Sequence, residues 1–348
     1  MHGLYRLTMP ATCQRIVLAS RPRGTITPEN FRLETIVQPA ADSLLEGEVL
    51  VKNRYLSIDP YMRGRMSAAK SYAPAQQLDQ TMVGETAGTV LASRFDGIRP
   101  GDQVVGRLGW TEMGVVPGDI LRRVDADTIP LSNYLGAVGM PGVTAWYGIN
   151  VILNAQPGQT LVVSAAAGAV GSVVGQLAKR KGCRVVGIAG GEQKCRYVVE
   201  QLGFDGCIDY RQSETLEALQ VSLQAAVPDG VDLLFENVGS TIFDASLACL
   251  NPHAKIALCG MVAAYNGGAA SLVNAGKLLT MRATLQGFII TEHPEIWPQA
   301  LEELAELVGS GLLQCHETMT DGLASAPMAL IGMLQGQNLG KQLIKLSD

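Results

Sequence analysis

A run of small residues, 165–171 (Ala-Ala-Ala-Gly-Ala-Val-Gly), follows an apolar segment and leads into a segment of helical period. In the dinucleotide-binding turn G-x-G-x-x-G, Ala166 takes the first glycine position, and Gly168 and Gly171 take the other two. The backbone approaches a pyrophosphate at the second position, and the following helix N-terminus offers N–H groups and a positive dipole end. The run therefore predicts a pyrophosphate site at Gly168, Ala169, Val170 and Gly171. The alternative is a helix start of small residues packed in a sheet.

The residues after the second predicted strand indicate which nicotinamide cofactor would bind. NAD enzymes place a carboxylate there for the ribose 2′-hydroxyl, whereas this chain has Gly190 and Gly191, followed by Lys194. Without an acid at that place, a 2′-phosphate can take charge-assisted contacts from Lys194 and from Arg196. The sequence thus predicts NADPH rather than NADH. The alternative for Lys194 is a solvated lysine at a helix start, and the nearby Glu192 argues against a phosphate.

The order and spacing of apolar runs along the chain predict the strands and helices that position these residues. From about residue 136, short apolar runs alternate with segments of helical period, which is typical of a parallel sheet covered by helices. We expect the six parallel strands of a complete dinucleotide fold at 160–164, 184–188, 207–210, 231–236, 255–260 and 284–290. We expect helices at 170–180, 192–202, 213–226, 240–250 and 295–309.

The first third of the chain has a different rhythm, with short β-branched runs at 15–19, 47–58, 82–93 and 102–108. Turn signals such as D-G and P-G separate these runs and indicate a β-rich, barrel-like domain. After Gly311 comes a short return, with a helix near 325–335 and a last strand that could rejoin this domain. We therefore expect a catalytic domain of residues 1–135, completed by 313–348, and an NADP-binding Rossmann domain of residues 136–312.

Composition excludes several function classes. The 348 residues have a formal net charge of −5 and no run of Lys or Arg. The sequence therefore contains no basic cluster that would bind a nucleic acid or an anionic membrane. The charge-free segment 128–178 is cut by prolines and asparagines into pieces too short to cross a bilayer, and we interpret it as buried core. Seven cysteines without C-x2-C spacing indicate free thiols in a reducing cytosol. With no export signal in the sequence, we expect a cytoplasmic protein.

Together these residues make the chain resemble the medium-chain dehydrogenase/reductase family. The resemblance is to the zinc-free branch of prostaglandin reductases, plant alkenal double-bond reductases and bacterial curcumin reductase. The matching segments are 21–31, 53–66, 139–148, 165–195, 235–239, 259–266, 285–290 and 336–345. The resemblance implies an α/β chain with a GroES-like β-barrel-type N-terminal domain, a doubly wound Rossmann sheet, and a homodimer formed through the Rossmann domains.

The same comparison bears on metal binding. Zinc alcohol dehydrogenases of this superfamily carry a G-H-E-x-x-G segment whose histidine is a metal ligand, and residues 83–88 of this chain have Gly84 in that place. The four-cysteine lobe for structural zinc is also missing from the sequence, because residues 95–125 contain no cysteine. We therefore expect no catalytic zinc and no other metal. The four histidines form no H-E-x-x-H pair and neighbour no G-x-S-x-G, which argues against hydrolases.

The resemblance also implies roles for residues along the predicted strand ends. Lys194 and Tyr210 would hold the adenosine 2′-phosphate, and Asn237 would contact the far side of the cofactor. The nicotinamide end would be formed by Cys259, Gly260, Met261 and Tyr265 along the ribose, Phe288, Ile289 and Ile290 behind the ring, and Asn338 from the C-terminal segment. Each has an alternative: Tyr210 could cap a strand, Phe288 could be core, and Asn338 could be a turn residue.

Hydride transfer without a metal suits a substrate that needs modest electrophilic help, such as an activated C=C bond. Hydride addition at the β-carbon of an enone or enal builds negative charge on the carbonyl oxygen, which needs a hydrogen-bond donor. The resemblance implies Tyr265 as this catalytic donor, with the nicotinamide ribose 2′-hydroxyl beside it, and Tyr265 or water as the source of the α-carbon proton. Tyr55 resembles the family's substrate-pocket tyrosine, and its alternative is β-domain core.

The predicted activity is therefore NADPH-dependent reduction of the C=C bond of a small α,β-unsaturated aldehyde or ketone. The first alternative is an NADPH:quinone oxidoreductase, and the second is a non-catalytic NADPH-binding protein. The segment 53–66 favours the double-bond branch, and the presence of both Tyr55 and Tyr265 argues against the binding protein.

Between Asn266 and Arg282 the family commonly has a longer, Pro-rich loop. In this chain the segment is short, has no proline and has a partly helical pattern. We therefore expect a more open or differently shaped pocket.

Overall fold

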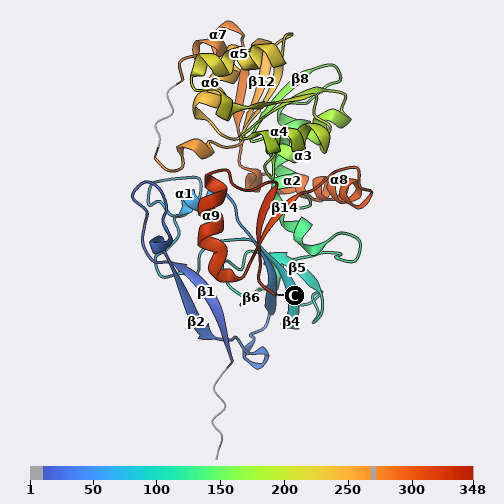
Figure 1. The fold of residues 1–348 in the computed structure, drawn as a ribbon. Coiled ribbons are helices and arrows are strands. Elements are labelled where there is room, and N and C mark those ends of the chain that lie inside the picture. Colours follow the sequence, from blue (N-terminus) through green and yellow to red (C-terminus); the bar gives the residue numbers. More distant parts are fainter. Residues whose placement is uncertain (1–10, 268–271, 348) are drawn as a thin grey trace, which may run out of the picture. The chain divides into compact units, whose positions relative to one another are not determined.

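The computed structural model describes residues 11–267 and 272–347 (Figure 1). Contacts divide the chain into two compact units. Unit 1 contains the described residues up to Ala126, Met319–Leu330 and the residues from Leu343, and unit 2 contains Asp127–Thr318 and Ile331–Gln342. The predicted fold class, a β-rich N-terminal domain and a Rossmann sheet, is confirmed.

Unit 2 is built on a parallel sheet whose six described strands lie in the order β10-β9-β8-β11-β12-β13. The strands are β8 (Thr160–Ser164), β9 (Arg184–Ala189), β10 (Gly206–Asp209), β11 (Val231–Glu236), β12 (Leu250–Leu258) and β13 (Thr284–Gly287). All six predicted strands are found, although β12 begins earlier than expected and β13 ends before Phe288. The chain crosses from one half of the sheet to the other between β8 and β11, so their carboxyl ends form the switch point where doubly wound sheets bind ligands.

The strands β8, β9 and β11 are largely buried, and their successive side chains point to opposite faces of the sheet, whereas all four residues of β13 are exposed. Leu161 and Val163 of β8 enter one apolar cluster and Val162 enters the other. The first face packs against α2 (Met140–Tyr147), α3 (Gly171–Arg180), α4 (Glu192–Glu200) and α8 (Trp297–Gly309), and the second against α5 (Leu216–Ala226), α6 (Ser240–Ala248) and α7 (Gly276–Thr280) (Figure 1). The sequence analysis did not anticipate α2 as a helix, because it has no polar face: seven of its eight residues are buried.

The other described strands form two sheets, which lie mainly in unit 1. The smaller sheet pairs β1 (Thr12–Leu18) with β2 (Phe31–Val37), and the larger has the order β14-β15-β3-β4-β5-β7, with β6 also on β3. The larger sheet's strands are β3 (Glu48–Ser57), β4 (Thr86–Ser93), β5 (Gln103–Gly106), β6 (Met113–Pro117), β7 (Arg122–Arg123), β14 (Glu317–Asp321) and β15 (Lys341–Lys345), and the helices are α1 (Tyr61–Arg65) and α9 (Ala326–Leu334). Leu343 of β15 pairs with Ser57 of β3, which returns the end of the chain to the N-terminal sheet.

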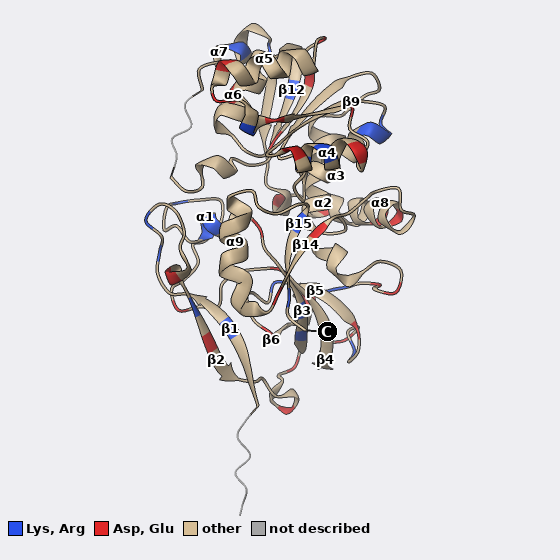
Figure 2. Cartoon of the chain, in the orientation of Figure 1, with Lys and Arg blue, Asp and Glu red and all other residues tan. Residues whose placement is uncertain are grey.

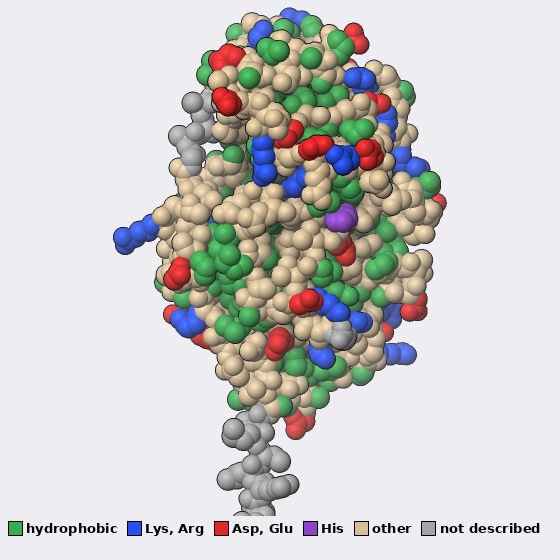
Figure 3. Space-filling model, viewed as in Figure 1, with side chains coloured by type: hydrophobic (Ala, Val, Ile, Leu, Met, Phe, Trp, Pro, Cys, Tyr) green, Lys and Arg blue, Asp and Glu red, His purple; other side chains and the backbone are tan. Residues whose placement is uncertain are grey.

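The surface carries charges of both signs. On the face in Figure 3, basic and acidic side chains are interspersed rather than gathered by sign. Helix α4 is an example, because it carries both acidic and basic residues: Glu192, Lys194, Arg196 and Glu200 (Figure 2). Within residues 11–267 and 272–347, no helix has both the length and the apolar character that a bilayer crossing requires.

The packing of α3 on the sheet generates a prediction about Gly175. A Cβ atom built on Gly175 would lie 1.9 Å from Cζ of the buried Phe204 ring, so Gly175→Ala should lower the free energy of unfolding in urea by about 1–3 kcal/mol through overpacking. The control is Gly276→Ala in α7, where no atom lies within 4 Å of the added Cβ and where no loss is expected. Equal unfolding midpoints for the two variants would contradict this packing.

Candidate active site

The predicted pyrophosphate turn is a tight loop between β8 and α3. Ala165 has a positive φ of 49°, and Gly168 N–H donates to the Ala165 carbonyl at 2.8 Å. A Cβ atom built on Gly171 would lie 2.3 Å from the same carbonyl oxygen, so this position requires glycine. Helix α3 begins at Gly171, and no side chain caps it. Within this turn Ser172 N–H donates to the Gly168 carbonyl at 3.0 Å, and Val173 N–H donates to the Val170 carbonyl at 3.1 Å.

Ala166 stands where the usual pattern has its first glycine, and the structure accommodates its methyl group. The residue is fully buried, and a Cβ atom built on Gly187 of β9 would lie 2.7 Å from Cβ of Ala166. The missing side chain at Gly187 therefore makes room for the extra methyl of Ala166. The neighbouring strand thus compensates for the departure from the glycine pattern.

The C-terminal segment of unit 2 lies beside this loop. Gly340 N–H donates to the Ala167 carbonyl at 2.8 Å, and Gly340 forms a parallel bridge with Gly168. The Asn338 side chain donates to the Gly340 carbonyl at 2.8 Å. The structure therefore brings Asn338 to the predicted pyrophosphate turn although about 170 residues separate them in the sequence.

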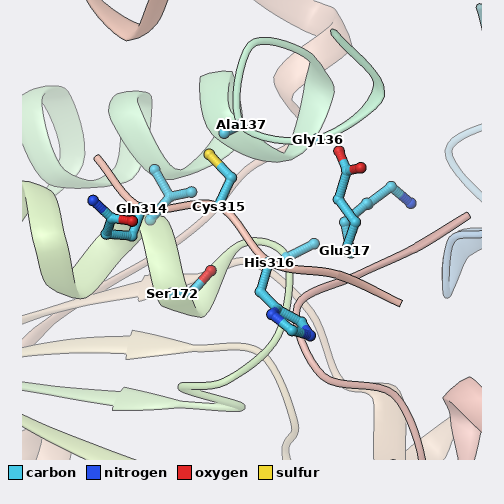
Figure 4. Close-up of a pocket in the computed structure, with 10 residues that line it drawn as sticks. Gly136, Ala137, Ser172, Gln314, Cys315, His316 and Glu317 are labelled. Carbon is cyan, nitrogen blue, oxygen red and sulfur yellow. The ribbon is translucent and has the colours of Figure 1, made fainter. Parts of the chain in front are cut away.

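Another segment of unit 2, residues 314–317, packs against α3. Gln176 of α3 donates to the Gln314 carbonyl at 3.0 Å and accepts from Gln314 N–H at 2.8 Å. Ser172 of α3, with Cys315, His316 and Glu317, lines a small pocket there (Figure 4). These contacts join residues 314–317 to the helix that follows the predicted pyrophosphate turn.

The adenosine end of the site contains two cations. The Lys194 ammonium donates to the Gly336 carbonyl at 2.8 Å. A Cβ atom built on Gly336 would lie 4.0 Å from Lys194 Nζ and 3.9 Å from Arg211 Nη2, so both cations lie near one point. Burial and the Arg211 charge lower the pKa of Lys194, because two like charges repel unless an anion joins them.

Tyr210 and Arg211 approach the glycines that replace the NAD-type carboxylate. A Cβ atom built on Gly190 would lie 2.9 Å from the Tyr210 hydroxyl and 3.0 Å from Arg211 Nε. The sequence analysis did not anticipate Arg211. The sequence did contain an indication of its role. Arg211 closely follows the third strand, and the carboxyl ends of parallel strands share one edge of the sheet.

Arg196, which the sequence analysis offered as a second phosphate contact, has a different partner. Its guanidinium pairs with Glu192 at 2.5 Å, one helical turn away on the exposed face of α4. In this ion pair the Arg196 charge offsets the negative charge of Glu192, which had argued against a 2′-phosphate.

At the switch point, hydrogen bonds join the ends of β8 and β11. Asn237 N–H donates to Ser164 Oγ at 2.8 Å, and the Asn237 side chain donates to the Ser164 carbonyl, also at 2.8 Å. Ser164 Oγ in turn donates to Glu236 Oε1 at 2.9 Å. The predicted residue Asn237 is therefore held at the junction of the two halves of the sheet.

The segment that carries Tyr265 is fixed to the end of β11 by backbone hydrogen bonds. The N–H groups of Cys259 and Gly260 both donate to the Glu236 carbonyl, and Val262 N–H donates to the Asn237 carbonyl. Met261 precedes a 3-10 turn at Val262–Ala264, and Tyr265 ends it. The Tyr265 hydroxyl lies 3.7 Å from a Cβ atom built on Gly260. The structure thus brings together Asn237, Cys259, Gly260, Met261 and Tyr265.

Glu236 is a buried carboxylate that the sequence analysis did not single out. The residue is fully buried, and its Oε1 accepts hydrogen bonds from Val238 N–H at 2.6 Å and Gly239 N–H at 2.7 Å as well as from Ser164. Its other oxygen, Oε2, is buried without a hydrogen-bond partner. Burial raises the pKa of Glu236 to about 7, against the opposing effect of these donors.

The remaining predicted residues lie in different settings. Phe288 packs in an aromatic cluster, with its ring centroid 5.5 Å from that of Tyr147 and 6.3 Å from that of Phe235. Ile289 is half-buried, and Ile290 is buried in the same apolar cluster. Tyr55 lies on β3, where it pairs with Ala87 and Lys345. Tyr55 therefore belongs to unit 1, whereas the other predicted site residues belong to unit 2.

Gly84, in place of the zinc-ligand histidine of alcohol dehydrogenases, sits in a packed site. A Cβ atom built there would lie 2.9 Å from Leu56 Cδ1 and 3.0 Å from the Trp110 ring. A histidine at position 84 would therefore require this packing to change. Among residues 11–267 and 272–347, no three His, Cys, Asp or Glu side chains are grouped so as to hold a metal ion.

The doubly wound sheet, the glycine turn and the paired cations define a dinucleotide-binding oxidoreductase fold. The chain matches a family described as the N-terminal domain of oxidoreductase over residues 14–124, and one described as zinc-binding dehydrogenase over residues 169–306. With full-length relatives well above 30% identity, the chain belongs to the medium-chain dehydrogenase/reductase family.

Three relatives illustrate this membership. The NADPH-dependent curcumin reductase of Escherichia coli (strain K12) is 42% identical, with 96% of this chain and 97% of the relative covered. The NADP(+)-dependent 2-alkenal reductase of Nicotiana tabacum is 38% identical, over 86% and 88% of the two chains. The crystal structure of CurA from Vibrio vulnificus in complex with NADPH has a TM-score of 0.89 and 40% identity, over 96% and 99%.

The burial of Glu236 generates a prediction about pH. Because the pKa of Glu236 in the folded protein is about 7, above the ordinary value of 4.5, the folded protein binds this proton more tightly than the unfolded chain does. The free energy of unfolding should therefore fall by about 2–3 kcal/mol through this group as pH rises from about 5 to about 8. Glu236→Gln removes the titration and should remove this part of the pH dependence, as measured by urea unfolding across that range.

The control for this experiment is Glu217→Gln, an exposed carboxylate in the first turn of α5. It should keep the wild-type pH dependence. If the Glu236→Gln curve ran parallel to the wild-type curve, the burial of a titrating carboxylate at this position would be contradicted.

Proposed function

We propose that this protein reduces the C=C bond of small α,β-unsaturated aldehydes and ketones with NADPH, without a catalytic zinc ion. The observation that carries the proposal is that unit 2 holds Tyr265 at the end of β11, within the same sheet edge that carries the Gly168–Gly171 turn and the Lys194–Arg211 cation pair. Relatives named curcumin reductase and 2-alkenal reductase, and a related structure that contains NADPH, support this assignment.

The residues of unit 2 suit NADPH at three places. Gly168, Ala169, Val170 and Gly171, with the uncapped start of α3, would hold the pyrophosphate. Lys194, Tyr210 and Arg211 would hold the 2′-phosphate, which is the anion that two neighbouring cations favour. The nicotinamide end would be formed by Asn237, Cys259, Gly260, Met261, Tyr265, Phe288, Ile289 and Ile290. Asn338 would close over the cofactor from the C-terminal segment, beside the pyrophosphate turn.

When bound, NADPH supplies the hydride that reaches the β-carbon of the substrate. The chain's own part is to orient the substrate and to stabilise charge on its carbonyl oxygen. The Tyr265 phenol donates a hydrogen bond where that negative charge develops, and it serves as a source of the proton for the α-carbon. Tyr55 in unit 1 orients the carbonyl group. Backbone hydrogen bonds join residues 259–263 to the end of β11 and the two residues after it. These bonds hold the segment that ends in Tyr265, so its phenol is positioned without a metal ion.

We further propose that unit 1 is the GroES-like catalytic domain and that unit 2 binds NADP. The family resemblance supports a homodimer, which size-exclusion chromatography with light scattering would measure. The seven cysteines, all within the described residues, are free thiols, which supports a cytoplasmic location because thiols stay reduced there.

The activity itself is tested by incubating the protein with NADPH and a panel of enals, enones, curcumin and quinones while the NADPH absorbance is followed. We expect consumption with the enals and enones, and a product in which the C=C bond is saturated and the carbonyl is retained. Consumption with quinones alone would instead support a quinone oxidoreductase. Consumption with no acceptor would support a non-catalytic NADPH-binding protein.

The cation pair generates a prediction about cofactor choice. Removing one charge-assisted contact to the 2′-phosphate costs about 1.5–3 kcal/mol, so Lys194→Ala and Arg211→Ala should each raise the KM for NADPH about 10- to 100-fold and leave the KM for NADH nearly unchanged. Arg196→Ala is the matched control, because Arg196 pairs with Glu192 on the surface of α4. An unchanged NADPH preference in both Lys194→Ala and Arg211→Ala would refute the 2′-phosphate site.

A second prediction concerns Tyr265. Tyr265→Phe removes the hydroxyl and keeps the ring, so kcat with an enone should fall about 10²-fold, as for the loss of one oxyanion donor, while the Kd for NADPH changes little. Tyr72→Phe, at an exposed tyrosine of unit 1, is the control and should keep the wild-type kcat. Wild-type turnover in Tyr265→Phe would exclude Tyr265 from the mechanism.

A further inference from the structure

Two thiols that the proposed reduction does not use face each other beside the adenosine end of the site. Cys195 lies in the first turn of α4 and Cys207 lies on β10. Cys207 Sγ donates a hydrogen bond to Cys195 Sγ at 2.9 Å. Both residues are partly exposed, so a small oxidant can reach them. Their separation is about 0.9 Å longer than the ~2.05 Å of a disulfide bond.

The surroundings favour a thiolate at Cys195. The hydrogen bond from Cys207 lowers the pKa of Cys195 and raises that of Cys207, although burial and the Asp209 carboxylate partly offset the effect at Cys195. Cys195 also lies near the positive N-terminal end of α4, which stabilises a thiolate. Burial instead raises the pKa of the thiols of Cys13, Cys183, Cys249 and Cys259.

We infer that Cys195 and Cys207 form a peroxide-reactive dithiol site that closes reversibly to a disulfide. The Cys195 thiolate attacks one oxygen of a hydroperoxide, and the O–O bond breaks to give a sulfenic acid and an alcohol, or water when the oxidant is hydrogen peroxide. The Cys207 sulfur then attacks the Cys195 sulfur, and the S–O bond breaks with loss of water. Two thiols are oxidised by two electrons and one hydroperoxide is reduced. A dithiol reductant restores both thiols.

The site is connected to the residues of the proposed 2′-phosphate contact, so this step rests on the proposed function. Lys194 directly precedes Cys195 in α4. On the other side, the Asp209 carboxylate, two residues after Cys207, accepts hydrogen bonds from Gly191 N–H at 2.7 Å and Arg211 N–H at 3.1 Å. Closing the disulfide brings the two sulfur atoms about 0.9 Å closer, directly beside Lys194 and the Asp209 contacts. The oxidised protein should therefore hold the 2′-phosphate less well.

The disulfide can be tested without any cofactor. The full-length protein is treated with hydrogen peroxide, its remaining thiols are alkylated, and it is cleaved after glutamate, which places Cys195 in residues 193–200 and Cys207 in residues 201–214. Mass spectrometry should find these two peptides linked, and the link should disappear after dithiothreitol. Cys195→Ser and Cys207→Ser should lose the link, whereas Cys315→Ser, at an exposed cysteine, should keep it. Absence of the link in the wild type would overturn the inference.

The consequence for the cofactor is tested by measuring the Kd of NADPH and of NADH before and after peroxide treatment. We expect oxidation to raise the Kd for NADPH about tenfold, to leave that for NADH nearly unchanged, and to be reversed by dithiothreitol. Cys207→Ser should show no such response. If the link forms and the Kd for NADPH stays constant, the connection to the 2′-phosphate is refuted while the dithiol site stands. If untreated protein does not distinguish NADPH from NADH, the proposed function itself fails.

Discussion

Hydrogen bonds across the switch point of the parallel sheet hold the site together. The ends of β8 and β11 are neighbours only because the chain reverses the direction of strand order there. Ser164, Glu236 and Asn237 join these ends through side-chain and backbone bonds. Backbone N–H groups of the segment that carries Tyr265 donate hydrogen bonds to the Glu236 and Asn237 carbonyls. The segment whose phenol we propose as the catalytic donor is held in this way by backbone hydrogen bonds to one strand end.

The carboxylate in this junction is costly to bury, and it also joins the strand end to the turn that follows it. One oxygen accepts from three donors and the other has no hydrogen-bond partner. Such a group destabilises the folded state when it is charged. In return it orders the turn Val238–Gly239 and the hydroxyl of Ser164, so the local energetic cost contributes to the preorganisation of the switch point.

The adenosine end depends on a different kind of interaction. Lys194 and Arg211 come from different elements of unit 2 and repel each other, and the two glycines before α4 keep the space beside them open to Tyr210 and Arg211. The cations and the adjacent thiols Cys195 and Cys207 share α4 and the end of β10. The two cations that we propose for the 2′-phosphate and the two thiols that we propose as a dithiol site therefore depend on the same short stretch of backbone.

Much of this arrangement could be predicted from the residues alone. The central strands of the Rossmann sheet were predictable because burial on both faces makes them apolar runs, as in β8 and β9, and the turn 165–171 was predictable because only small residues fit between strand and helix. Lys194 was proposed because glycines stand where NAD enzymes place a carboxylate, and Tyr210 was proposed from the family resemblance. Helix α2 was not predicted, because a helix buried on all sides has no polar face to reveal its period.

Tertiary structure decided the contacts between residues far apart in the sequence. The methyl of Ala166 is accommodated by Gly187, Asn338 reaches the glycine turn through Gly340, and Arg211 approaches Lys194 only after β9 and β10 pair. Arg196 looked equivalent to Lys194 in the sequence, but the helical turn directs it to Glu192. Local pattern fixes which elements form, because period and turn chemistry act over a few residues. Which side chains meet depends on strand order and register, and those are settled only when the whole sheet assembles.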